Sequence, residues 1–167
     1  MLRGASTGVA VAIVVAVAIG AGGGAHAVGK PACSLLTAED VVAVMSEPVT
    51  WSSAKDGGAE DATICIYGTK TTPDYAVHLA IGGGRAEFDS NVHQLQDMGR
   101  QYHLPPLTAV SGVGDAAYLN TSGQGFAQIY VVKGETYFTL TVYCKPADCA
   151  GQSAALGRKV AERIGAK

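Results

Sequence analysis

A glycine-rich segment followed by an arginine is the pattern in this chain closest to an anion-binding loop. Gly82, Gly83 and Gly84 separate a segment with strand-like alternation from one with helical spacing, and Arg85 follows them. Backbone N–H groups at a helix start attract anions, and glycines allow close approach. The segment lacks the Gly-Lys-Ser/Thr ending of a P-loop and the spacing of a dinucleotide-binding fingerprint. The sequence therefore favours a connector, with anion binding by Gly83, Gly84 and Arg85 as the alternative.

Asp115 and the histidines could supply acid–base chemistry. Asp115 follows a Gly-x-Gly segment, where a carboxylate can act as a base or can accept backbone hydrogen bonds in a turn; we favour the turn. His78 falls in an expected strand, and His93 and His103 are too far apart in sequence for the i,i+4 spacing of a helical metal site. No Gly-x-Ser-x-Gly nucleophile motif occurs. The sequence thus predicts no catalytic residue, metal or cofactor, and a carboxylate–histidine hydrolase is the alternative.

Four cysteines could form either a zinc site or disulfides. Cys144 and Cys149 have a tolerable zinc spacing, but no second close pair accompanies them. An even number in an exported chain indicates two disulfides, for which three pairings exist. We favour Cys144–Cys149, because Pro146 can form a turn between them, and Cys33–Cys65, which joins the chain's start to a central strand. Loop-closure entropy gives about 3–4 kcal/mol for the long bridge and about 2 kcal/mol for the short one.

The first 27 residues have the three parts of a secretory signal peptide. Arg3 gives a positive start, residues 9–19 are almost entirely apolar, and Ala25-His26-Ala27 is a small-x-small cleavage site. The apolar run is shorter than the about 20 residues that span a bilayer, so a retained anchor is the less favoured alternative. Lys30-Pro31-Ala32 before Cys33 does not fit a lipidation signal. We expect cleavage after Ala27, a secreted or envelope location, and no stable membrane anchor afterwards.

The mature segment, residues 28–167, has the size of one domain. The whole chain has 12 Lys and Arg against 14 Asp and Glu, and removal of Arg3 leaves 11 against 14, a net charge near −3. The charges are scattered singly. The absence of a basic stripe argues against nucleic acid as a partner and against adhesion to anionic lipid.

Hydrophobic periodicity and turn residues predict the elements that would position these side chains. The expected helices cover residues 37–47, 86–102 and 152–164, with Thr37 as an N-cap. The expected strands cover residues 49–51, 63–67, 75–81, 110–119, 126–133 and 136–143, with an exposed loop at 52–61. Hairpin-linked strands pair antiparallel. We therefore expect an α+β fold: a twisted antiparallel sheet of about five to six strands, with helices packed on it and two disulfides.

Tyrosines concentrate in these expected strands or at their edges. Aromatic side chains on a partly exposed sheet provide a large contact area at low entropic cost. Ordinary strand packing is the favoured interpretation. Some of the rings must nevertheless project on the sheet face away from the helices, and Tyr75 and Tyr130 are the candidates for ligand contact. The tyrosines concerned are Tyr67, Tyr75, Tyr118, Tyr130, Tyr137 and Tyr143.

Three segments together resemble a known family. They are Cys33-Ser34-Leu35-Leu36-Thr37 before an acidic helix start, Cys65-x-Tyr67, and the VSGVGDAAY segment at residues 110–118. This combination is similar to the actinobacterial exported envelope proteins classed as DUF3558, over about residues 33–164. The resemblance implies an exported protein with a disulfide-linked antiparallel sheet and packed helices, as in related extracellular sensor domains of mycobacterial receptor kinases. This chain lacks the family's frequent lipidated cysteine, and the resemblance supplies no catalytic residues.

These observations lead to one functional hypothesis and two alternatives. The leading hypothesis is a non-enzymatic secreted or envelope-associated binding domain. Its partner would be another envelope protein or a small apolar ligand held between the sheet and a helix. The alternatives are an envelope hydrolase that uses Asp115 and a histidine, and a purely structural envelope protein.

Overall fold

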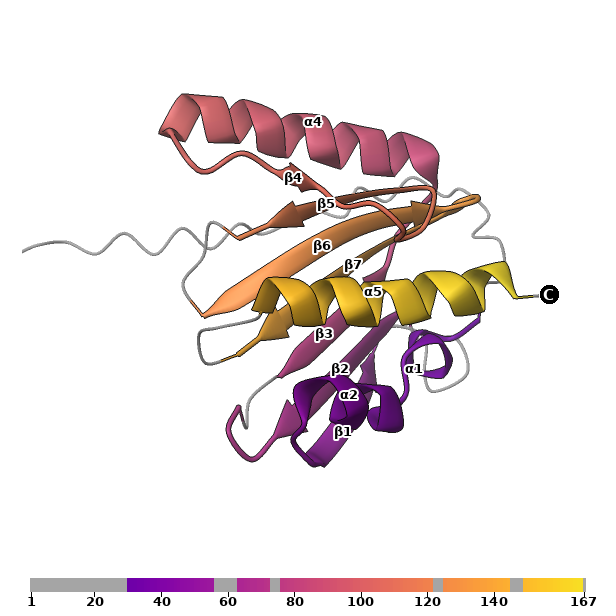
Figure 1. Cartoon of the computed structure of the whole chain (residues 1–167). Helices are drawn as coiled ribbons and strands as arrows, with labels where there is room; N and C mark the ends of the chain where they lie inside the picture. Colours follow the sequence, from indigo (N-terminus) through magenta and orange to yellow (C-terminus); the bar gives the residue numbers. More distant parts are fainter. Residues whose placement is uncertain (1–29, 56–62, 73–75, 122–124, 145–148, 167) are drawn as a thin grey trace, which may run out of the picture.

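The computed structural model describes residues 30–55, 63–72, 76–121, 125–144 and 149–166. They form an α+β fold in which one open antiparallel sheet carries helices on both faces (Figure 1). The predicted signal peptide and Tyr75 lie outside the described residues. Within the described ranges, no helix combines the length and the apolar character needed to cross a bilayer.

The sheet has seven strands in the order β1-β2-β3-β7-β6-β5-β4, and every neighbouring pair is antiparallel. The strands are β1 (Val49–Lys55), β2 (Ile64–Thr69), β3 (Val77–Ile81), β4 (Thr108–Ala109), β5 (Ala116–Asn120), β6 (Phe126–Lys133) and β7 (Thr136–Tyr143). The β6–β7 hairpin has the predicted bounds. Gly134 has a φ of 56° in its turn, a backbone conformation that glycine adopts at no steric cost.

The strand count exceeds the predicted five to six, and β1 is longer than predicted. Residues 52–55 were expected in a loop, but Ser52 to Lys55 continue β1 and pair with β2. A strand at the edge of a sheet needs neither an apolar face nor alternation, so polarity alone is a poor predictor there. The two residues of β4 at the opposite edge are too few to leave a periodic pattern.

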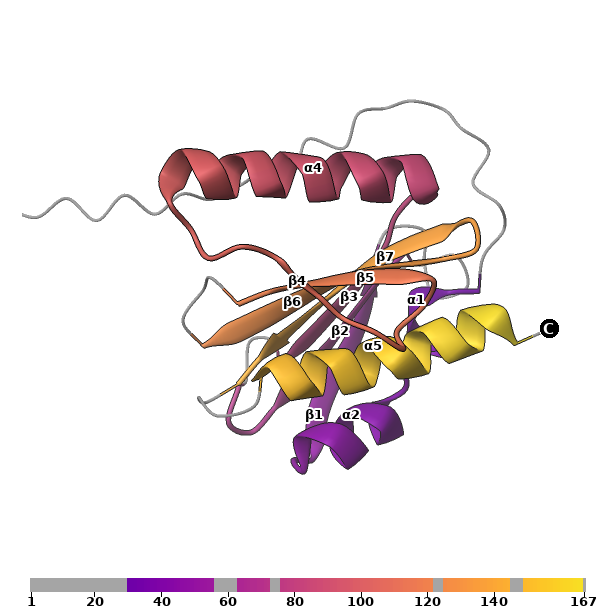
Figure 2. The same ribbon diagram turned by 45° about the horizontal axis from the view of Figure 1, so that its top comes forward.

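The helices form two layers on opposite faces of the sheet (Figure 2). Helices α1 (Ala32–Leu35), α2 (Ala38–Met45) and α5 (Cys149–Gly165) cover one face, and α4 (Arg85–Tyr102) lies on the other. The expected face away from the helices therefore carries α4. Residues alternate between the two faces along β6: Ile129 packs in the core that includes α5, and Tyr130 packs with Phe88 of α4.

Both predicted disulfides are confirmed. Cys33–Cys65 links α1 to β2, and Cys144–Cys149 links the end of β7 to the start of α5. The short helix α1 was not predicted, because four residues are too few for helical periodicity. Its position against β2 follows from the covalent bond and from burial of Leu35.

Candidate functional site

The glycine loop contacts a carboxylate of the chain itself. The N–H of Gly83 donates to Glu87 Oε2 at 2.7 Å, and a Cβ at Gly83 would overlap that carboxylate. Arg85 pairs with Asp89 at 3.3 Å on the exposed surface and lies over the Phe88 ring. Glu87 therefore occupies the position in which an external anion would meet the loop.

The Gly82–Gly84 loop also continues the β3–β7 pairing. Gly82 N–H donates to Tyr137 O at 2.8 Å, and Tyr137 N–H donates to Gly83 O at 2.7 Å. A Cβ at Gly82 would stand 2.9 Å from the Tyr137 ring, so the glycine permits the close approach. These contacts support the connector interpretation of the loop.

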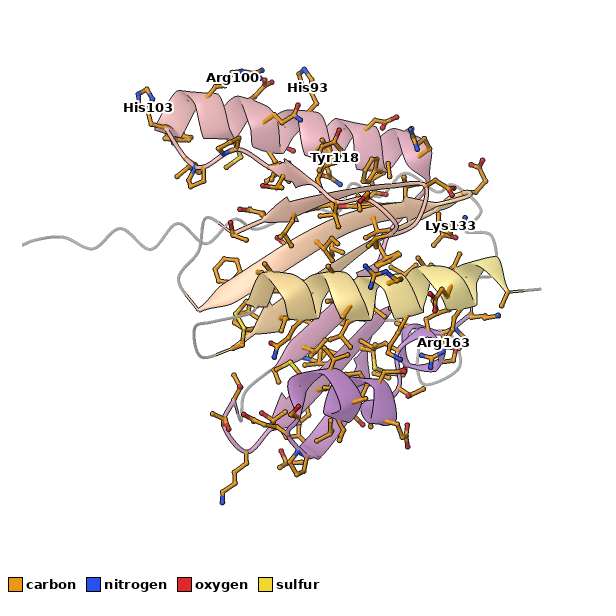
Figure 3. All side chains as sticks on the ribbon, viewed as in Figure 1. His93, Arg100, His103, Tyr118, Lys133 and Arg163 are labelled. Atoms are coloured by element: carbon orange, nitrogen blue, oxygen red, sulfur yellow. A yellow bond between two sulfur atoms is a disulfide. The ribbon has the colours of Figure 1, made fainter. Side chains whose placement is uncertain are left out.

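Asp115 closes the β6–β7 turn from the neighbouring strand. Its carboxylate accepts from Lys133 Nζ and from the N–H of Gly134, both at 2.7 Å. These two hydrogen bonds lower the pKa of Asp115 below its ordinary value. Figure 3 labels Lys133 near this end of the sheet. The favoured turn role of Asp115 therefore agrees with the geometry.

His78 does not meet Asp115. His78 pairs with Thr141 on β7, whereas Asp115 donates its N–H to Val132, which pairs with Tyr137. The offset of four residues along β7 and three strand steps across the sheet separate the two groups by about 20 Å. Burial, followed by the charge of Lys55, lowers the pKa of His78.

A carboxylate and an imidazole do meet on the open surface of α4. His93 Nδ1 is 3.2 Å from Asp97 Oδ2, and both side chains are largely exposed on α4. Figure 3 shows His93, Arg100 and His103 on the side of α4 that points away from the sheet. Among the described residues, no group of three or more His, Cys, Asp or Glu side chains could hold a metal ion.

The strand tyrosines are mainly packing residues. Tyr130 and Tyr137 are buried under α4, and Phe88 meets Tyr137 edge to face with ring centroids 5.8 Å apart. Burial raises the pKa of Tyr130 to about 12. Tyr67 is buried on the opposite face and donates its hydroxyl hydrogen to Leu36 O. Tyr130 is thus unavailable as the ligand contact that the sequence suggested.

A shallow groove lies between α2 and the start of β1. It has a volume of about 620 Å³ and opens on the protein surface. We call it the α2–β1 groove; Ala38, Glu39, Val42, Ala43, Ser46, Glu47, Pro48 and Val49 line it. Val42 is 40% exposed in its wall, which is unusual for a valine of a packed helix.

The local sequence explains why Val42 faces outward. Thr37 and Asp40 form a capping box that starts α2, with the Thr37 N–H donating to Asp40 Oδ2 at 3.0 Å. The helix then directs Val41 into the core, where it is fully buried. Because successive residues are about 100° apart around a helix, Val42 points to a different side. That side faces the groove.

The edge strand β1 lies beside this groove. Its one partner among the described strands is β2, so the backbone groups on its outer side face away from the sheet. Val49, the first residue of β1, also lines the groove. Trp51 is 38% exposed, and a Cβ at Gly68 would overlap its indole ring, so the ring lies against β2.

No family model matches the chain, and neither a curated protein nor a solved structure is significantly similar to it. The DUF3558 resemblance therefore continues to depend on its three sequence segments. The α2–β1 groove and the edge strand β1 are therefore the features from which a function can be inferred.

A partly buried ion pair ties the groove wall to α5. Arg163 of α5 contacts the Asp40 carboxylate and donates to Leu35 O at 2.9 Å, while Lys159 Nζ lies 3.4 Å from Asp40 Oδ1. Figure 3 shows Arg163 extending from α5 toward α1 and α2. Burial opposes ionisation of Asp40, but hydrogen bonds from Arg163 and Thr37 hold the pKa of its carboxyl well below the ordinary value. Helix α2 is thereby tied to α5.

Sequence reasoning did not identify the groove. The signal that could have revealed it is the Val41-Val42 pair, since a single-face helix buries one of two adjacent valines and exposes the other. No comparable pattern in the sequence indicates that β1 extends to Lys55. Of the residues that line the groove, Val49 belongs to the sheet, and the others belong to α2 or to the turn that follows it.

Proposed function

We propose that the protein is an exported binding domain that captures an extended segment of a partner protein. The segment adds as a further strand to the outer edge of β1 and places an apolar side chain in the α2–β1 groove. Such strand addition combines main-chain hydrogen bonds for affinity with a side-chain pocket for specificity. The observation that carries the proposal is the groove at the first residue of an exposed edge strand.

The two edges of the sheet differ in their capacity to accept a strand. β4 has two residues, whereas β1 has seven. The register of β1 is irregular between Val49 and Trp51, which leaves Trp51 to Lys55 as a regular run. No proline interrupts this run, and Lys55 at its end is its one charged residue. Among the described strands, β2 alone pairs with this run, so its outer side has no strand partner there.

The groove supplies the contact that makes such an edge selective. Val42, Ala43 and Pro48 are exposed and give it apolar walls. An extended segment directs alternate side chains to the same face, so one of them can point to the α2 side while its backbone pairs with β1. Covering Val42 removes apolar surface from water and favours binding.

The proposed location of the protein is outside the cytoplasm. A signal peptide over residues 1–27 and two disulfides support export to an oxidising compartment. The DUF3558 resemblance supports an association with the cell envelope. The partner is accordingly another exported or envelope protein.

Selection from a displayed library of random short peptides on oxidised residues 28–167 tests the proposal. Selected peptides are expected to shift the backbone amide resonances of β1 and α2. Val42→Lys is expected to weaken their binding about tenfold or more, since it places a charge against an apolar side chain. Leu104→Lys is the matched control, because Leu104 is 45% exposed far from β1, and it should leave binding unchanged.

Two results would overturn the proposal. One is binding that Leu104→Lys weakens as much as Val42→Lys does. The other is a dimer of the protein alone, measured by sedimentation, that Val42→Lys abolishes, because a second copy would then be the occupant of the groove.

A further inference from the structure

We infer that the segment bound at β1 carries a lysine or arginine two residues from its apolar anchor. This inference rests on the proposed function and adds the charge of the partner to it. It follows from the charges that line the α2–β1 groove and from the geometry of an extended chain.

The groove is acidic. Glu39 and Glu47 line it, and no Lys, Arg or His is among its lining residues. Glu39 is exposed, and none of the ion pairs in the described part of the chain involves it. Glu39 lies in the first turn of α2, beside the groove.

The positive charges that contact α2 do not line the groove. Arg163 and Lys159 reach α2 from α5, where both contact Asp40. Asp40 is buried on the core side of the helix and is not among the groove residues. The C-terminal end of α2 at Ser46 lines the groove as well, and the negative end of a helix dipole favours cations.

The spacing of the charge follows from strand geometry. In an extended chain, residues two apart point to the same face and are about 7 Å apart. A side chain two positions from the anchor therefore faces the α2 side too. A lysine or arginine side chain at that position is long enough to reach a carboxylate at the rim of the groove.

The experiment uses three versions of one peptide selected on the oxidised mature protein. The residues two before and two after its apolar anchor are lysine, serine or glutamate. We expect the lysine version to bind about fivefold tighter than the serine version at low salt, and the glutamate version to bind more weakly than both. The advantage of lysine should shrink as salt is raised.

Glu39→Gln should remove most of the difference between the lysine and serine peptides. Glu135→Gln is the control, because Glu135 is an exposed carboxylate in the distant β6–β7 turn. Glu47→Gln provides a second variant at the groove, and thermal unfolding of each variant checks that it is folded.

The outcomes separate this inference from the proposed function. Equal binding of the lysine and serine peptides, with both still weakened by Val42→Lys, overturns the charge preference and leaves strand addition standing. A lysine preference that Glu39→Gln and Glu47→Gln leave intact also overturns the inference. Binding of all three peptides without shifts in β1 or α2 overturns the proposed function itself.

Discussion

Replacing Asp40 with asparagine should destabilise the protein by about 2–3 kcal/mol at neutral pH. The change removes the carboxylate that faces Arg163 and Lys159, while the asparagine amide oxygen can still accept from the Thr37 N–H. Breaking a buried ion pair costs about 3–5 kcal/mol. The loss expected here is smaller, about 2–3 kcal/mol, because the Arg163 side chain is 36% exposed and can turn toward water. Urea unfolding of the oxidised protein measures the loss.

The same variant should show a defined pH dependence. A carboxyl whose pKa is depressed by folding stabilises the protein above its unfolded pKa of about 3.9, and this contribution disappears as the pH falls toward the folded value. The gap between wild type and Asp40→Asn should therefore be constant above about pH 5 and narrow steadily below about pH 4. The control is Asp89→Asn, which removes an exposed pair with Arg85 and should cost less than about 0.5 kcal/mol. Two results would refute the role assigned to Asp40. One is an equal loss of unfolding free energy in Asp40→Asn and Asp89→Asn. The other is a stability difference between wild type and Asp40→Asn that does not change with pH.

Two further stability effects are expected. Gly114→Ala should cost about 2–4 kcal/mol, because the backbone there has a positive φ of 61° and a Cβ would stand 2.6 Å from Val132 O. Gly112→Ala should cost about 1 kcal/mol, because Gly112 also has a positive φ but a Cβ there would meet open space. Equal losses of stability in urea unfolding would contradict the close packing at Gly114. The Cys33→Ser/Cys65→Ser double variant should lose about 3–4 kcal/mol by the same assay, with a loss below about 1 kcal/mol as the contrary result.

The predictions from sequence succeeded where the determining interactions are local. The predicted N-cap at Thr37 involves a contact with a residue three positions on, and the β6–β7 hairpin needs one turn around Gly134. The pairing of Cys144 with Cys149 follows from a five-residue separation. In each case the residues that fix the structure are close together in the chain, so their types and spacing were informative.

The predictions failed where distant segments decide the outcome. Ser52 to Lys55 form a strand because β2 pairs with them, and the polar composition of this stretch suggested a loop. Tyr130 was a candidate for ligand contact until α4 was found on its face of the sheet. Strand pairing and the layering of helices on a sheet are properties of the whole fold.

The candidate site shows the same division. The apolar side of α2 could be predicted, but the groove beside it depends on the path from Pro48 into β1. The ion pair between Asp40 and Arg163 joins residues that are 123 positions apart in the chain, so no local pattern indicates it. The site is therefore visible in the fold and almost absent from the sequence.

Amide hydrogen exchange of the oxidised mature protein, with and without a selected peptide, tests strand addition at β1 most directly. A strand added to the edge satisfies outward-facing N–H groups of β1, so alternate amides between Trp51 and Lys55 should exchange at least about tenfold more slowly in the complex. The two residues of β4 at the opposite edge should show no change. Tight peptide binding with unaltered exchange along β1, or with protection at β4 or α4, would contradict the account.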